Sequence, residues 1–140
     1  MLHQVPALGT VRIAQLIAAV ATPHRFRSKR QFWSYCGLAV RTRSSADYRF
    51  VGRDVRRTAK AATRGLTQDY NRTLKYIFKS AALTALRYEP FKSRYAKLLA
   101  RGLRPELARV TMARKLAAIT LAVWKKGEAF DVDKLIKHAA

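Results

Sequence analysis

Two adjacent serines, Ser44 and Ser45, lie among arginines, with Arg41 and Arg43 before them and Arg49 after them. A serine hydroxyl can attack a phosphodiester when cations stabilise the developing negative charge and another group accepts the proton. Such a reaction would link the protein covalently to DNA. Serines beside arginines also occur in loops that only contact phosphates, so local composition leaves both interpretations open.

The chain around these serines is strongly basic. Between Arg41 and Arg64, eight of 24 residues are Lys or Arg and two are Asp, and no acidic residue precedes Asp47. The whole chain has 29 Lys and Arg against 8 Asp and Glu, which gives a net charge of +21. The positive side chains repel one another in a folded protein, and they favour binding to polyanions through release of the polyanions' counterions. Nucleic acid is therefore the leading partner, and a cationic face that serves only solubility is the alternative.

The candidate nucleic-acid contacts flank the serines or begin the helix before them. Cations at a helix start are unfavourable in the helix dipole, so their positions there suggest an external anion. Tyr48 and Phe50 among the arginines suit base stacking, or they anchor the loop to the core. The predicted nucleic-acid-binding residues are Arg25, Arg27, Lys29, Arg30, Arg41, Arg43, Arg49, Arg53, Arg56, Arg57 and Arg64.

Other chemistries have little support in the sequence. A two-metal nuclease needs several converging carboxylates, whereas the acids here are few and scattered, so we predict no metal site in this chain. Cys36 is the single cysteine; beside Trp33 and Tyr35 it is expected to be a small buried hydrophobe. No apolar run is long enough to span a membrane, and no signal-peptide pattern opens the chain. We expect no membrane contact and a cytoplasmic location.

The elements that must position the basic stretch have helical patterns. Ser28, with Gln31 three residues later, predicts a capping box and a helix of about ten residues, and Gly37 is placed as its left-handed cap. Thr67 is the expected N-cap of a long helix that Pro90 ends. A short helix is expected over 92–101, and an apolar helix over 105–124 is expected to be the central core helix or a subunit contact.

The N-terminal turn Val5-Pro6-Ala7-Leu8-Gly9-Thr10 precedes another helical segment. It resembles the second half of a helix-hairpin-helix element, in which backbone N–H groups bind a DNA phosphate. Such hairpins usually have a second glycine, and Ala7 stands at that position here. A plain helix N-terminus is the alternative.

Together these patterns predict an all-α, mainly helical fold: a compact helical domain with a helix-hairpin-helix-like N-terminus and a basic loop or small β-ribbon. We expect one domain over 1–140. Within it, 1–37 is the helix-hairpin-helix-like half, 38–66 the basic serine loop, 67–126 the helical core and 127–140 a tail.

The order of segments resembles the C-terminal transposase domain of the IS-one-ten (IS116/IS902-type) insertion-sequence transposase family. The most specific pieces are FRSKRQFWSYCGL followed by RTRSS, and ARKLAAITLAVWKKGEAFD. The resemblance implies that a serine of the basic loop is the nucleophile that joins to DNA, which here is Ser45 or Ser44, with Ser45 preferred. It also implies a RuvC-like domain with acidic metal ligands that acts together with this one.

The implied function is that of a DNA-binding and strand-joining domain in DNA transposition and recombination. The implied partners are DNA, a structured guide RNA, a RuvC-like domain or full-length transposase, and further copies of this chain. Mg²⁺ is expected only with the RuvC-like partner. Ala46 follows the serines where many relatives have Gly or Ser, and the RuvC-like acids are absent, so we expect a truncated or partial enzyme. The alternatives are a non-enzymatic basic nucleic-acid-binding protein and a helical interaction module.

Overall fold

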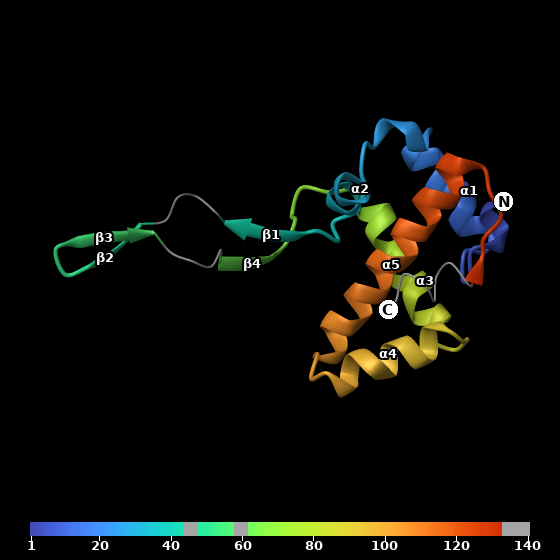
Figure 1. Cartoon of the computed structure of the whole chain (residues 1–140). Helices are drawn as coiled ribbons and strands as arrows, with labels where there is room; N and C mark the ends of the chain where they lie inside the picture. Colours follow the sequence, from blue (N-terminus) through green and yellow to red (C-terminus); the bar gives the residue numbers. More distant parts are fainter. Residues whose placement is uncertain (44–47, 58–61, 133–140) are drawn as a thin grey trace.

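A computed structural model describes residues 1–43, 48–57 and 62–132. In this part of the chain, five α-helices and two short 3₁₀ helices form a body, from which four β-strands extend as an arm (Figure 1). The predicted mainly helical fold is confirmed, and the described part of the basic stretch forms β-strands. The helical elements are η1 (Leu2–Gln4), α1 (Thr10–Val20), η2 (Pro23–Arg25), α2 (Lys29–Tyr35), α3 (Arg72–Ala85), α4 (Phe91–Ala100) and α5 (Pro105–Lys126).

Helix α5 runs through the middle of the body and packs against α2, α3, α4 and both 3₁₀ helices. Pro105 occupies its first turn, where the missing N–H is harmless, and Gly127 ends it in the left-handed conformation with φ 66°. The predicted central core helix is therefore confirmed. Its buried side chains are Ala108, Met112, Ala113, Leu116, Ala117, Thr120, Leu121 and Val123.

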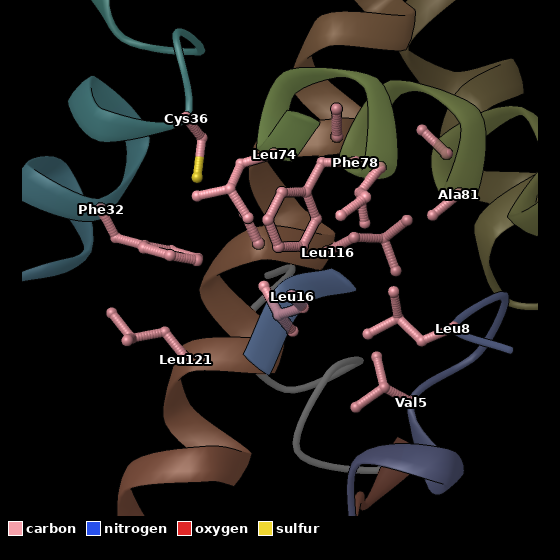
Figure 2. Close-up of a cluster of buried hydrophobic side chains, with 14 of the residues drawn as sticks. Val5, Leu8, Leu16, Phe32, Cys36, Leu74, Phe78, Ala81, Leu116 and Leu121 are labelled. Carbon is pink, nitrogen blue, oxygen red and sulfur yellow. The ribbon is translucent and has the colours of Figure 1, made fainter. Parts of the chain in front are cut away.

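The hydrophobic core joins side chains from both ends of the sequence (Figure 2). Phe32 of α2 and Phe78 of α3 meet edge to face, with ring centroids 5.6 Å apart. Leu16 of α1 and Leu116 of α5 are fully buried in the same cluster. Cys36 is also fully buried there, and this burial raises the pKa of its thiol. The prediction that Cys36 is a small core residue is confirmed.

The turn before α1 holds Ala7 in the left-handed region, with φ 65°, where a glycine would be unstrained. Arg12 Nη1 donates a hydrogen bond of 2.7 Å to the Ala7 carbonyl, and Gly9 is the N-cap of α1. The turn and the following helix are present. The helix-hairpin-helix-like assignment stays a prediction, with a plain helix N-terminus as its alternative.

Helix α2 begins and ends as the sequence predicts. The Ser28 hydroxyl accepts the Gln31 backbone N–H at 3.4 Å. Gly37 has φ 68°, and the Leu38 N–H donates to the Trp33 carbonyl at 2.8 Å, as in a Schellman motif. The helix has seven residues, which is shorter than expected. Its end fixes the direction in which the chain enters the arm.

The N-cap of α3 is Asn71, whose side chain accepts the Leu74 backbone N–H at 3.1 Å. The prediction that Thr67 caps this helix is wrong. The Thr67 N–H and hydroxyl both donate to the Ala39 carbonyl, at 2.9 and 3.3 Å. Thr67 therefore ties the two ends of the arm together, and the helix begins later.

The arm consists of two nested antiparallel pairs (Figure 1). Strands β1 (Val40–Arg43) and β4 (Ala62–Leu66) form its base, and β2 (Tyr48–Val51) and β3 (Asp54–Arg57) form the outer hairpin. The base pair is irregular between Val40 and Thr42, where Gly65 on the partner strand has φ 66°. A bulge of this kind bends a ribbon. The register of the outer hairpin, which the sequence left open, pairs Phe50 with Val55.

Candidate nucleic-acid interface

The root of the arm is fixed to the body by side-chain hydrogen bonds. Arg114 of α5 donates through Nε to the carbonyl of Leu38, just before β1. In return, Trp33 Nε1 donates to the Arg114 carbonyl at 2.9 Å. The guanidinium of Arg114 is half-buried, and this burial lowers its pKa from the ordinary value. Because these bonds join the central helix to the chain that enters β1, the body sets the direction of the arm.

Two open, polar grooves adjoin each other at this root and share Ser34 and Asp69. We call them together the root groove. The part of about 420 Å³ is lined by Ser34, Ala39, Val40, Arg41, Thr42, Thr67, Gln68 and Asp69. The part of about 390 Å³ is lined by Arg25, Phe26, Gln31, Ser34, Tyr35 and Asp69.

Each part of the root groove is lined by one arginine. The Arg25 guanidinium lies 4.9 Å from the ring centroid of Tyr35 and donates to the Val20 carbonyl at 3.4 Å, so its position is fixed. Arg41 lines the other part. Arginines and hydroxyl groups are the usual protein donors to phosphate oxygens. Asp69, which lines both parts, would repel a phosphate, so we expect phosphates to bind near the arginines.

The predicted cations fall into two groups in the described chain. Arg25, Arg27, Lys29 and Arg30 are exposed on the body, around the start of α2. The others belong to the arm: Arg41, at its base, lines the root groove together with Arg25, whereas the outer hairpin lies away from the body (Figure 1). The arm residues of the prediction are Arg41, Arg43, Arg49, Arg53, Arg56, Arg57 and Arg64.

Ser44 and Ser45, the predicted catalytic residues, lie outside the described residues. Strand β1 ends at Arg43 and β2 begins at Tyr48, so the serines belong to the sequence between these strands. The root groove lies beside the beginning of β1, because Val40, Arg41 and Thr42 line it.

One cationic cluster joins the predicted contact Lys29 to two residues, Arg94 and Lys115, that were not predicted. Burial lowers the pKa of Lys115 on α5, and the nearby charges of Arg94 on α4 and Lys29 on α2 lower it further. Three helices therefore direct positive charge towards one another on the body. The Arg114-Lys115 pair, which interrupts the apolar middle of α5, is the sequence signal that could have revealed it.

The described residues include no group of three or more His, Cys, Asp or Glu side chains that could hold a metal ion. The same residues include no helix that is long and apolar enough to cross a membrane.

The fold and the interface define a class: helical proteins that carry a cationic β-arm with a polar groove at its root. Residues 1–96 match the model of the Transposase IS116/IS110/IS902 family, and the chain belongs to that family. The matched region contains α1, α2, the whole arm and α3. A comparison with curated proteins yields no match. The predicted family is confirmed, and the role of the chain is transposase-related.

Proposed function

We propose that this chain is the DNA-binding and strand-joining domain of a transposase, and that Ser45 attacks a DNA phosphodiester. Ser44 is the alternative nucleophile. Membership of the transposase family over residues 1–96 is the observation that carries the proposal. The cationic arm and the root groove support it, because they offer arginines and hydroxyl groups close in sequence to both serines.

In the proposed reaction, the serine Oγ forms a bond to phosphorus while the bond from phosphorus to the leaving DNA oxygen breaks. The hydroxyl proton of the serine passes to a general base, and the leaving oxygen takes up a proton. The serine phosphodiester that results can be attacked by the hydroxyl of another DNA end, which joins that end and frees the serine. Two phosphodiester exchanges thus add up to strand joining.

The arginines would act on the charge of the DNA backbone. Arg41, Arg43 and Arg49 flank the serines in sequence and would stabilise the charge that develops on the phosphate oxygens. The cations around the start of α2 and those of the outer hairpin would hold the flanking backbone. As the family resemblance implies, we assign Mg²⁺ to a RuvC-like partner domain.

The proposal extends to the assembly in which this domain works. As the family resemblance implies, its partners would be a RuvC-like domain or full-length transposase, a guide RNA and further copies of the chain. Its place of action would be the bacterial cytoplasm, on the nucleoid. The net charge of +21 supports the nucleic-acid partners, DNA and a guide RNA.

The proposal is tested by incubating the chain with nicked and branched DNA, with and without a RuvC-like partner and Mg²⁺. A denaturing gel and peptide mapping then detect a protein–DNA adduct. We expect an adduct at Ser45 that Ser45→Ala abolishes and that Ser44→Ala and the body variant Ser93→Ala retain. An adduct that survives in a Ser44→Ala, Ser45→Ala double variant would contradict serine attack. Salt-sensitive binding without any adduct would favour the non-enzymatic DNA-binding alternative.

A further inference from the structure

The outer hairpin, residues 48–57, lies at the far end of the arm (Figure 1). It exposes apolar side chains there. Phe50 is 79% exposed, Val51 59% and Val55 51%. Single exposed apolar residues are common on proteins, whereas exposed apolar residues that are neighbours often mark a contact surface, and Phe50 and Val55 are such neighbours. The helical body lies away from this hairpin and leaves both side chains uncovered.

The register of the hairpin gives it two different faces. Phe50 pairs directly with Val55, and residues paired across two strands share a face. Because successive residues alternate, Val51, Asp54 and Arg56 lie on the opposite face. Gly52 and Arg53 form the turn, and Gly52 has φ 66° as the first central residue of a tight hairpin turn requires. Phe50 and Val55 thus form an apolar pair on one face, and Val51 lies on the other face beside charged residues.

A partner would contribute contacts that the hairpin lacks in the free chain. An isolated two-stranded hairpin is at best marginally stable in water, and this one exposes its aromatic residue. Residues 48–57 contain four arginines and one aspartate, in a chain of net charge +21. A second copy of the chain would bring like charges together at this surface. Charge complementarity therefore selects a nucleic acid as the partner.

The dimensions of the hairpin fit one groove of double-stranded DNA. Two paired strands lie about 4.8 Å apart, and the major groove, about 12 Å wide, admits a two-stranded ribbon. The minor groove, about 6 Å wide, is too narrow for it without deformation. Thymine offers a 5-methyl group as an apolar contact in the major groove, and phenylalanine is among the side chains that contact it.

We propose that the outer hairpin enters the major groove of duplex DNA, where Phe50 and Val55 contact thymine methyl groups. Arg53 at the turn and Arg56 on the opposite face contact the sugar–phosphate backbone beside the groove. This inference rests on the proposed function, because it takes DNA as the partner of the arm. It adds a base preference and assigns it to residues that are separate from the serine chemistry.

The test measures binding of the full chain to a short duplex of alternating adenine and thymine. The matched duplex has every thymine replaced by deoxyuridine, which lacks only the methyl group. Fluorescence anisotropy should show tighter binding to the thymine duplex, by about fourfold for each methyl group that the hairpin buries. Phe50→Ala and Val55→Ala should remove this difference. Both side chains are exposed, so the fold should persist, and circular dichroism checks this.

Two control variants separate the hairpin from the rest of the surface. Tyr76→Ala removes an aromatic residue of α3 that is 70% exposed on the body, and it should keep the difference between the duplexes. Arg56→Gln should also keep the difference and should reduce the magnitude of the salt slope, d log K/d log[salt], by about 1.

Three outcomes would overturn the inference. The first is equal affinity for the two duplexes, and the second is a thymine preference that survives Phe50→Ala. The third is tighter binding to single-stranded DNA or to RNA than to duplex. In each case salt-dependent binding of DNA would leave the proposed function standing. Absence of DNA binding under all conditions would instead contradict both the proposed function and the inference.

Discussion

Gly37 links the end of α2 to the segment that returns from the arm. Its φ is 68°, and a Cβ atom at this position would lie 2.5 Å from Cγ of Tyr70. Any other residue would therefore be strained by its backbone and would also push the tyrosine ring away. The left-handed cap could be predicted from the sequence, because a glycine after a helix is a local signal. The contact with Tyr70 could not, because the arm separates the two residues in sequence.

We predict that Gly37→Ala lowers the free energy of unfolding by about 2–4 kcal/mol, from backbone strain and overpacking together. The control is Gly127→Ala, since Gly127 has φ 66° and only Met1 Sδ, at 4.0 Å, near its Cβ position. That variant should lose only the strain contribution, about 1–2 kcal/mol. Urea unfolding followed by circular dichroism measures both values, and equal losses would show that the Tyr70 contact contributes nothing.

When the Lys115 side chain is charged, it destabilises the fold of the protein without bound DNA. Its pKa is lowered by burial and by the charges of Arg94 and Lys29, so the folded protein binds this proton less tightly than the unfolded chain. The full destabilisation by Lys115 is present at pH values below its pKa in the folded protein. The free energy of unfolding rises as the pH increases from that pKa to the ordinary pKa of a lysine. We predict that Lys115→Met raises the melting temperature at pH 7 by about 1–3 °C and reduces this alkaline gain.

Thermal unfolding at pH 7 and at alkaline pH, each in low and high salt, measures this effect. The advantage of Lys115→Met should shrink in high salt, because added ions screen the repulsion among the three cations. The matched control is Lys97→Met, which removes an exposed lysine of α4. If both variants shift the melting temperature equally, total charge rather than this cluster is responsible.

At the scale of elements, the arm depends on its root. Arg114 donates to the Leu38 carbonyl, and Thr67 donates to the carbonyl of the next residue, Ala39. The hydrogen bonds of the outer hairpin lie farther from the body, and the helices do not support them (Figure 1). Loss of a bond at the root should therefore affect the entire arm, whereas changes at its tip should stay local.

We predict that Arg114→Met increases amide hydrogen exchange in β1 and β4 by about tenfold and lowers the free energy of unfolding by about 1–3 kcal/mol. The reason is that the Leu38 carbonyl loses its donor in a partly buried place. Exchange in α4 should change much less. Arg109→Met, which removes an exposed arginine of the same helix, is the control, and an equal increase in arm exchange there would refute the role of Arg114.

Elements whose signals are local could be predicted from the sequence. Three helix boundaries were predicted and are confirmed: the start of α2 from Ser28 with Gln31, its C-terminal end from Gly37, and the start of α5 from Pro105. Thr67 was assigned to the wrong element because its hydroxyl finds a partner across the arm, at Ala39, which no local pattern shows. The pairing of β1 with β4 was missed for the same reason, because it joins strands on either side of the outer hairpin.

The candidate site was predicted in part. The cations of α2 and of the arm were named from composition, and Arg114 and Lys115 were missed because α5 was judged by its apolar character. The root groove could not be foreseen, because Arg25, Arg41 and Asp69 approach one another only through folding. The assignment of Ser45 or Ser44 stays a prediction, because both residues lie outside the described part of the chain.

At the scale of the whole molecule, the position of the charge should matter more than its total. We predict that Arg27→Gln with Arg30→Gln, at the start of α2, reduces the magnitude of the salt slope for DNA binding by about 2. Arg101→Gln with Arg104→Gln, between α4 and α5, removes the same charge from another part of the body and should leave the slope unchanged (Figure 1). Titrations at several salt concentrations measure both slopes. Equal effects would mean that binding follows net charge.

The pairing of Val40 with Leu66 keeps the two ends of the arm side by side. The distance between the two points where the arm joins the helical body is therefore as short as for a surface loop. This distance does not depend on the length of the ribbon beyond that pair. Because closing a longer loop adds little entropy, residues could be added to or removed from both strands without moving a helix. Evolution could therefore adjust the reach of the arm in steps, while the core keeps its sequence.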